Sequence, residues 1–124
     1  SLGRRLLLSV KDEMITQNLP FVNKNGTMKE VVLKMTESRL GLALIGNEEK
    51  LEGIITDGDL RRSLLMSDDF TKIEIKDILN KSPMTAYEND NLQVAHERMK
   101  EARLQSLVVK NNDEKIVGVI QIFK

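Results

Sequence analysis

The chain has 124 residues, of which 40% are hydrophobic and 31% charged, as in an ordinary soluble globular protein with a real core. Its 19 basic and 19 acidic residues leave no net charge, so it lacks the cationic excess of a module that binds nucleic acid or acidic membranes. It has no cysteine, which excludes disulfides and thiolate metal sites. No apolar run approaches the roughly 20 residues of a membrane span, so a cytoplasmic protein is expected.

The first expected elements are short. Residues 1–9 read as a linker that enters from an upstream segment, and residues 10–15 as an amphipathic turn of helix. Residues 18–22 should be extended, because a proline keeps the residue before it out of helical space. Thr27 can then cap a helix, and Glu30 three residues later completes the pattern of a capping box.

This helix has one apolar face at the i, i+3, i+4, i+7 spacing, formed by Met28, Val31, Val32 and Met35. Gly41 is expected to end it. Two strands follow at residues 42–45 and 51–56, joined by a polar turn, and a second helix is expected at residues 59–66.

The same order of elements then repeats along the chain. The segment 75–79 repeats the segment 10–14, and the segment 118–120 repeats the segment 53–55, both at an offset of 65 residues. Each repeat is about 60 residues long, which is too small to bury both faces of its own sheet. We therefore expect an α/β (α+β) fold of two β-α-β-β-α units. The units should pack sheet against sheet with pseudo-twofold symmetry and leave a cleft between them.

The segment 53–62, Gly-Ile-Ile-Thr-Asp-Gly-Asp-Leu-Arg-Arg, is predicted to be a buried strand that ends in a polar corner and starts a helix. The spacing of Thr56 and Asp59 places a hydroxyl and a carboxylate on the same side of this corner. Two interpretations stay open. The pair can be a capping box that satisfies the helix N-terminus without any ligand, or it can face a bound molecule.

The repeated unit resembles the cystathionine-β-synthase (CBS) domain, which occurs in tandem pairs called Bateman modules. The resemblance rests on the corner, on the two amphipathic helices, and on two lead-ins with Asp12 and Met14 in the first repeat and Asp77 and Leu79 in the second. Residues 3–7 before residues 10–12, together with residues 56–62, are more specifically similar to the C-terminal regulatory region of D-arabinose-5-phosphate isomerases of the KpsF/GutQ type.

This resemblance implies an upstream sugar isomerase (SIS) domain that interconverts D-ribulose 5-phosphate and D-arabinose 5-phosphate. The reaction leads to Kdo, the acid sugar of lipopolysaccharide and some capsules. The expected organisation is a linker at 1–9, a first CBS unit at 10–70, and a second unit at 71–124 that lacks its final helix. The catalytic residues would lie outside this chain, which is then not itself an enzyme and requires no cofactor. A homodimer of CBS pairs within a homotetramer is expected.

By this resemblance, Thr56 and Asp59 stand at the positions that CBS domains use for phosphate and ribose. The resemblance and the chemistry of the corner together nominate eight ligand-binding residues: Thr56, Asp57, Gly58, Asp59, Arg61, Arg62, Pro20 and Ala43. Glycine lets the backbone approach a ligand, the arginines supply charge for phosphate or a sugar-acid carboxylate, and the last two line an apolar slot. The expected effector is a nucleotide or nucleotide-sugar: CMP-Kdo, CMP, AMP or ATP.

The second repeat carries Gln121 and Lys124 where the first carries Thr56 and Asp59, so a single competent site is expected. A ligand-free oligomerisation module is the alternative function. The lone His96 is expected to be a packed helical residue, because a metal site needs several converging donors.

Overall fold

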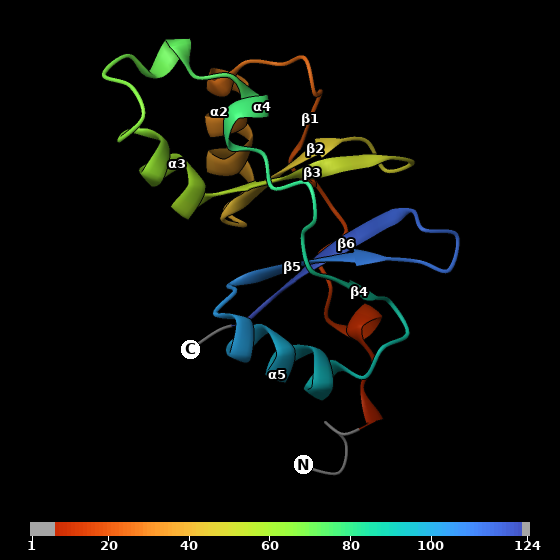
Figure 1. Ribbon diagram of the computed structural model, residues 1–124. Coiled ribbons are helices and arrows are strands. Elements are labelled where there is room, and N and C mark those ends of the chain that lie inside the picture. The colour runs from red at the N-terminus through yellow and green to blue at the C-terminus, as the bar shows by residue number, and fades with distance from the viewer. Residues whose placement is uncertain (1–6, 123–124) are drawn as a thin grey trace. The chain divides into compact units, whose positions relative to one another are not determined.

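The computed structural model describes residues 7–122 and shows a mixed α/β chain with two small sheets (Figure 1). Residues 1–6 of the expected linker and Lys124 lie outside the described residues. The order of elements confirms the α/β (α+β) fold class, since strand, helix, strand, strand occurs twice. The elements are η1 (Val10–Asp12), β1 (Phe21–Val22), α2 (Met28–Ser38), β2 (Leu42–Gly46), β3 (Leu51–Thr56), α3 (Asp57–Ser63), η2 (Phe70–Lys72), α4 (Ile75–Ile78), β4 (Thr85–Tyr87), α5 (Leu92–Ala102), β5 (Ser106–Lys110) and β6 (Ile116–Gln121).

The chain divides into two compact units. The first-sheet unit is residues 20–83, and the second-sheet unit joins residues 1–19 to residues 84–124. Their sheets, β1-β2-β3 and β4-β5-β6, have the same topology, in which the first pair of strands is parallel and the second antiparallel. The two sheets are therefore copies of one design, as the sequence repeat predicts.

The helix α2 packs its apolar stripe on the first sheet. Met28, Val31 and Met35 are buried in one cluster with Ala43 and Ile45 of β2. The corresponding stripe of α5 is buried in the second-sheet unit, with Leu92, Ala95 and Met99 as its members. Because the same spacing is buried in both helices, the amphipathic pattern identified the helical faces correctly.

Two details of α2 differ from expectation. Val32, expected on the apolar face, is 38% exposed. The helix ends at Ser38, where Arg39 adopts the left-handed conformation with φ 60°, and not at Gly41. The left-handed residue that closes a helix is usually glycine, since a side chain is disfavoured there. Gly41 instead uses its own positive φ of 74° in the turn that leads into β2.

The lead-in of each repeat, η1 in the first and α4 in the second, packs in the unit that contains the sheet of the other repeat. η1 belongs to the second-sheet unit, where the Val10 and Lys11 N–H groups donate to the carbonyls of Asp90 and Glu88, each at 2.9 Å. Val10 is fully buried in the core of that unit. α4, the lead-in of the second repeat, belongs in turn to the first-sheet unit. Each sheet is thus completed by the opening segment of the other repeat.

Matching bridges fix these exchanged segments. Ile15 pairs with Val119 of β6, and Asn80 pairs with Ile54 of β3, both antiparallel and at equivalent positions of the repeat. The bridge to Ile54 has two backbone hydrogen bonds, of 3.0 and 2.9 Å. The neighbouring Gly53 has no room for a side chain, because a methyl group there would overlap the carbonyl oxygen of Asn80.

Asp12 provides a pH-dependent contact in the lead-in. Its carboxylate accepts from the Ser9 N–H at 2.8 Å and from the Ser9 hydroxyl at 3.0 Å. The backbone bond first, and then the side-chain bond, lowers the pKa of Asp12 below its usual value. A lowered pKa in the folded state contributes stability above the unfolded pKa, which is about 4. That stability is lost as the pH falls through the folded value.

We therefore expect an NMR titration to show the Asp12 carboxyl titrating below the value of an unfolded-chain aspartate. The Asp12→Asn variant should lose less stability than the parent chain when the pH falls from 5 to 2. Equal acid sensitivity of the two chains would contradict this assignment.

Candidate functional site

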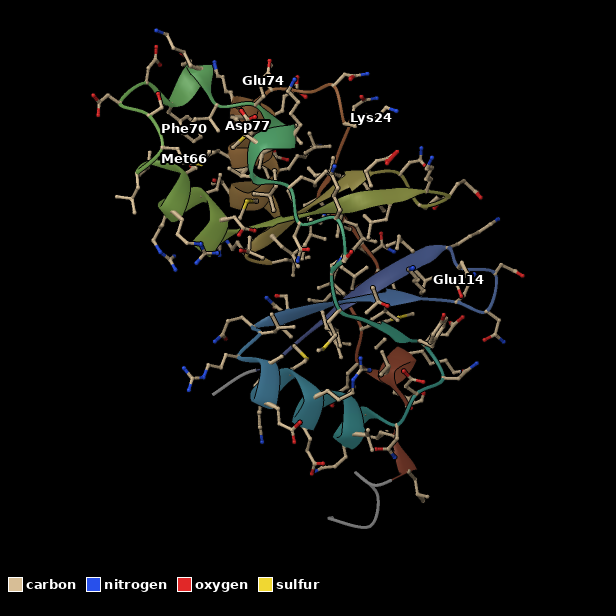
Figure 2. All side chains as sticks on the ribbon, viewed as in Figure 1. Lys24, Met66, Phe70, Glu74, Asp77 and Glu114 are labelled. Atoms are coloured by element: carbon tan, nitrogen blue, oxygen red, sulfur yellow. The ribbon has the colours of Figure 1, made fainter. Side chains whose placement is uncertain are left out.

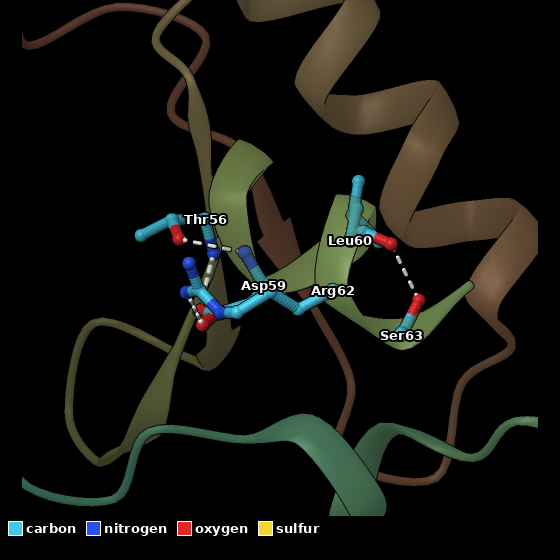
Figure 3. Close-up of polar contacts among 5 residues, drawn as sticks. All are labelled: Thr56, Asp59, Leu60, Arg62 and Ser63. Atoms are coloured by element: carbon cyan, nitrogen blue, oxygen red, sulfur yellow. Dashed lines mark hydrogen bonds and ion pairs between the residues drawn. The ribbon is translucent and has the colours of Figure 1, made fainter. Parts of the chain in front are cut away.

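The polar corner stands at the carboxyl end of β3. Thr56 is the N-cap of α3, and its Oγ1 accepts from the Asp59 N–H at 3.2 Å (Figure 3). In return, Oδ2 of Asp59 accepts from the Thr56 N–H at 2.9 Å. This is a complete capping box, so α3 starts at Asp57, two residues before the expected start. The helix-cap interpretation of Thr56 and Asp59 is therefore correct, and it leaves the second carboxylate oxygen for other partners.

That second oxygen is taken by Arg62. One guanidinium nitrogen of Arg62 lies 2.8 Å from Oδ1 of Asp59, and this ion pair joins residues one turn apart on α3 (Figure 3). The Arg62 side chain is 70% exposed, whereas that of Asp59 is 21% exposed. The guanidinium also lies over Gly58, where an added methyl group would be 3.1 Å from its nearest nitrogen. Sequence spacing alone did not indicate this contact.

The first N–H groups of a helix have no partner inside the helix. In α3 the Asp57 N–H donates to the carbonyl of Gly41 at 3.1 Å, and the Asp59 N–H is taken by Thr56. The N–H of Gly58 lies between them and is the donor of this turn that the cap does not use. The corner therefore presents one backbone donor, one hydroxyl, one carboxylate and one guanidinium along a single turn.

The remaining nominated residues lie in the same first-sheet unit. Arg61 is exposed and takes no part in the Asp59–Arg62 ion pair. Pro20 is buried, and its carbonyl accepts from the Leu44 N–H at 2.8 Å. The Ala43 side chain is fully buried in the core beside α2. Pro20 precedes β1 at the same end of the sheet as Thr56, whereas Ala43 lies in the central strand β2 and is 0% exposed as a whole residue.

The second repeat has no comparable corner within the described residues. Gln121 stands opposite Ser106 in the β5–β6 ladder, as Thr56 stands opposite Leu42 in the β2–β3 ladder. Its side-chain amide donates to the Ser106 hydroxyl at 3.3 Å. The position of the capping threonine is thus occupied by an amide that bonds across the ladder.

A pocket of about 600 Å³ lies elsewhere in the first-sheet unit, and the sequence did not indicate it. It is bordered by the loop before α2, by the start of β3 and by α4, with Lys24 and Glu74 on its rim (Figure 2). None of the eight nominated residues lines it. Part of the pocket lining comes from the polar run Asn23-Lys24-Asn25-Gly26. In the sequence this run is equally typical of an ordinary turn.

Other kinds of site find no support in the part of the chain that the structure describes. Residues 7–122 hold no group of three or more side chains able to bind a metal ion. No described helix is long and apolar enough to cross a membrane. His96 is half-buried, and its Nε2 atom is buried without a hydrogen-bond partner among the described residues.

Two copies of one strand–helix–strand–strand unit, each with a lead-in, define a CBS pair. The family model of the CBS domain matches residues 10–66 and again residues 75–122, and the chain belongs to this family. Among solved structures, a CBS domain protein from Pyrobaculum aerophilum, determined in complex with AMP, superposes with a TM-score of 0.80. It is 23% identical, and the match covers 92% of this chain and 87% of that one. At this identity the likeness concerns the fold.

The sequence relatives are more specific. A probable arabinose 5-phosphate isomerase of Haemophilus influenzae is 40% identical over 122 residues, and the arabinose 5-phosphate isomerase KpsF of Escherichia coli is 36% identical over 124 residues. The matches cover 98% and 99% of this chain. The chain spans only 36% and 38% of the length of these relatives.

Proposed function

We propose that this chain is the ligand-sensing CBS pair of a longer D-arabinose-5-phosphate isomerase, and that the corner at Thr56–Arg62 binds a nucleotide or nucleotide-sugar. The observation that carries the proposal is the geometry of Asp59. One carboxylate oxygen is fixed by the cap, and the other is held only by the exposed side chain of Arg62, which a ligand hydroxyl would have to replace. The isomerase relatives and the AMP complex of a CBS protein of the same fold support it.

Each part of a nucleotide has a matching group at this corner. A carboxylate accepts hydrogen bonds from the two ribose hydroxyls, which suits Asp59. A phosphate is bound by free N–H groups, hydroxyls and guanidinium groups, which suits Gly58, Thr56 and the arginines. The charge of Arg61 and Arg62 also suits the carboxylate of an acid sugar, so CMP-Kdo is a candidate beside CMP, AMP and ATP. Pro20, at the same end of the sheet as Thr56, would border the base, with Ala43 buried behind it.

The proposed arrangement places an SIS domain before a linker at 1–9, with CBS units at 10–70 and 71–124. The isomerase chemistry then belongs to that upstream domain, and the CBS pair changes its rate or its assembly. A ligand can do so only if it binds two states of the enzyme with different affinity. Recognition is the only chemistry assigned to the residues of this chain.

Calorimetry of the 124-residue chain tests this function directly. We expect at least one of CMP-Kdo, CMP, AMP and ATP to bind with a dissociation constant below about 1 mM, which corresponds to about 4 kcal/mol of binding free energy. Flat traces for all four at millimolar concentration would exclude ligand sensing by the chain alone.

One observation favours the second candidate function, a ligand-free oligomerisation module. The segment after α3 exposes three consecutive apolar side chains, Leu64, Leu65 and Met66 (Met66 is labelled in Figure 2), and Leu65 is 88% exposed. Exposed apolar runs commonly mark protein–protein contacts. Light scattering separates the two candidates, because a tight homodimer that no nucleotide alters would favour the oligomerisation module.

A further inference from the structure

We propose that the pocket of the first-sheet unit binds a small organic anion with an apolar body. The pocket has a volume of about 600 Å³, and sites for small molecules usually have roughly 300–1,000 Å³. Its lining includes Glu52 near the start of β3, whereas the corner follows Thr56 at the end of that strand. The pocket is therefore a second site, separate from the corner to which the proposed function is assigned.

The second-sheet unit closes the equivalent place with its own backbone. Three hydrogen bonds, each of 2.9 Å, join the segment of η1 to the segment that starts α5: the N–H groups of Val10, Lys11 and Leu92 donate to the carbonyls of Asp90, Glu88 and Leu8. By the repeat, the equivalent pairs in the first-sheet unit are Ile75 with Gly26, Lys76 with Lys24, and Met28 with Ile73. Within residues 7–122 none of these three pairs is hydrogen-bonded, and all six residues line the pocket. The pocket is thus open at the place where the other unit is closed.

Charge gives a physical reason for this difference. In the second-sheet unit, the bonded residues Glu88 and Lys11 carry opposite charges. The equivalent residues of the first-sheet unit are Lys24 and Lys76, which are both positive and both exposed. Closing the pocket in the same way would bring two ammonium groups together, and like charges repel each other at short range. An anion at the rim of the pocket would remove that repulsion.

Lys24 is the charged side chain of the lining that has no counter-ion in the part of the chain that the structure describes. Nζ of Lys76 lies 3.2 Å from Oε2 of Glu74, which is on the rim with Lys24 (Figure 2). Oε1 of Glu52 lies 3.8 Å from Nζ of Lys50. No ion pair of Lys24 is found within residues 7–122. The carboxylates of the lining are thus already paired, so the group that Lys24 attracts is an anion.

The apolar part of the lining calls for an apolar body on the same molecule. Met28, Ile73 and Ile75 belong to the core and are at most 5% exposed, yet all three border the pocket. A hydrocarbon or aromatic body placed against them would remove apolar surface from water, which is favourable in proportion to the area removed. Because the molecule must also bring a negative charge to Lys24, the ligand class is an organic acid with a carboxylate, sulfonate or phosphate group.

The probe for this site is anilinonaphthalene sulfonate, an aromatic anion, with uncharged phenylnaphthylamine as its matched counterpart. In fluorescence titrations we expect the anion to bind the parent chain with a dissociation constant below about 1 mM. In Lys24→Gln the anion should bind about fivefold more weakly, while the affinity for the uncharged molecule changes by less than about twofold. Lys34→Gln is the matched control, because Lys34 is exposed on α2 and does not line the pocket. It should leave both affinities within about twofold of the parent values.

Amide NMR of the parent chain locates the bound anion. Shift changes should be concentrated in the three lining segments, at residues such as Asn25, Glu52 and Ile75. They should be absent at the equivalent residues of the second-sheet unit, which are Asn89, Val117 and Val10. The inference is overturned if the parent chain does not bind the anion, if the shift changes centre on the exposed run at residues 64–66, or if they are equal in the two units.

The variants provide the other decisive outcomes. The inference also fails if Lys24→Gln weakens both probes equally or neither of them, or if Lys34→Gln has the same effect as Lys24→Gln. Thermal melts of the three proteins check that each is folded. AMP should bind Lys24→Gln as it binds the parent chain, so failure of this inference leaves the proposed function standing. Absence of nucleotide binding at the corner would in turn leave the pocket as a site of its own.

Discussion

Replacing Gly53 by alanine is expected to destabilise the chain by about 3 kcal/mol or more, which places it among the severe single substitutions. The added methyl group would overlap the carbonyl oxygen of Asn80 and lie 2.8 Å from Cδ1 of Leu79. The carbonyl cannot simply retreat, because Asn80 is held to Ile54 by hydrogen bonds in both directions. Urea unfolding of the parent chain and the variant measures the effect.

Alanine substitutions at two further glycines are expected to cost less stability than the substitution at Gly53. Gly118→Ala should be less damaging, since its methyl group would lie 2.8 Å from the carbonyl oxygen of Ile15 and 2.9 Å from the sulfur of Met14. Gly58→Ala should be tolerated, because the nearest atoms belong to the mobile end of the Arg62 side chain, and alanine favours a helix by about 1 kcal/mol. Equal stability of the Gly53 and Gly58 variants would show that the close contact with Asn80 is not the constraint.

Replacing Asp59 by asparagine is expected to weaken nucleotide binding by about two orders of magnitude while the chain stays folded. Asparagine keeps an oxygen that can accept from the Thr56 N–H, so most of the cap survives. The lost negative charge removes charge-assisted hydrogen bonds to the ribose hydroxyls, each worth about 1.5–3 kcal/mol. Calorimetry with AMP measures the affinity, and circular dichroism follows the fold.

Asp77→Asn is the matched control for that experiment. Asp77 accepts from the Glu74 N–H at 3.0 Å at the start of α4, which is the same kind of capping contact away from the corner. Its variant should lose a similar, small amount of stability and keep its affinity for AMP. If the two variants bind AMP equally well, Asp59 is a helix cap and nothing more.

Local signals in the sequence predicted most of the first-sheet unit. Thr56 and Asp59 form the capping box that their spacing indicates, and the buried stripe of α2 follows the helical period. Apart from Val32, which is exposed in the middle of α2, the errors lie at the element ends, where a single residue determines the boundary. Arg39 ends α2 although glycine is the usual left-handed residue, and α3 begins directly after its cap.

The periodicity and the repeat in the sequence did not predict contacts between segments that are distant along the chain. The repeat shows that the two lead-ins are equivalent, but nothing in a lead-in says which of two similar sheets it will join. The contact of Arg62 with Asp59 was hidden for a different reason. Two consecutive arginines on a short helix look alike in the sequence, and only the direction of their side chains separates the one that is paired from its neighbour.

The exchange of lead-ins means that the two repeats are interlocked and cannot be separated as working parts. A chain cut after residue 66, where the first family match ends, would leave β3 without α4 and Asn80, and would leave Val10 and Ile15 without their backbone partners Asp90 and Val119. Anything joined ahead of residue 7 is fastened to the sheet that lacks the polar corner. A displacement that reaches residue 7 along the chain would therefore enter the second-sheet unit, while the nominated ligand groups stand on the first-sheet unit.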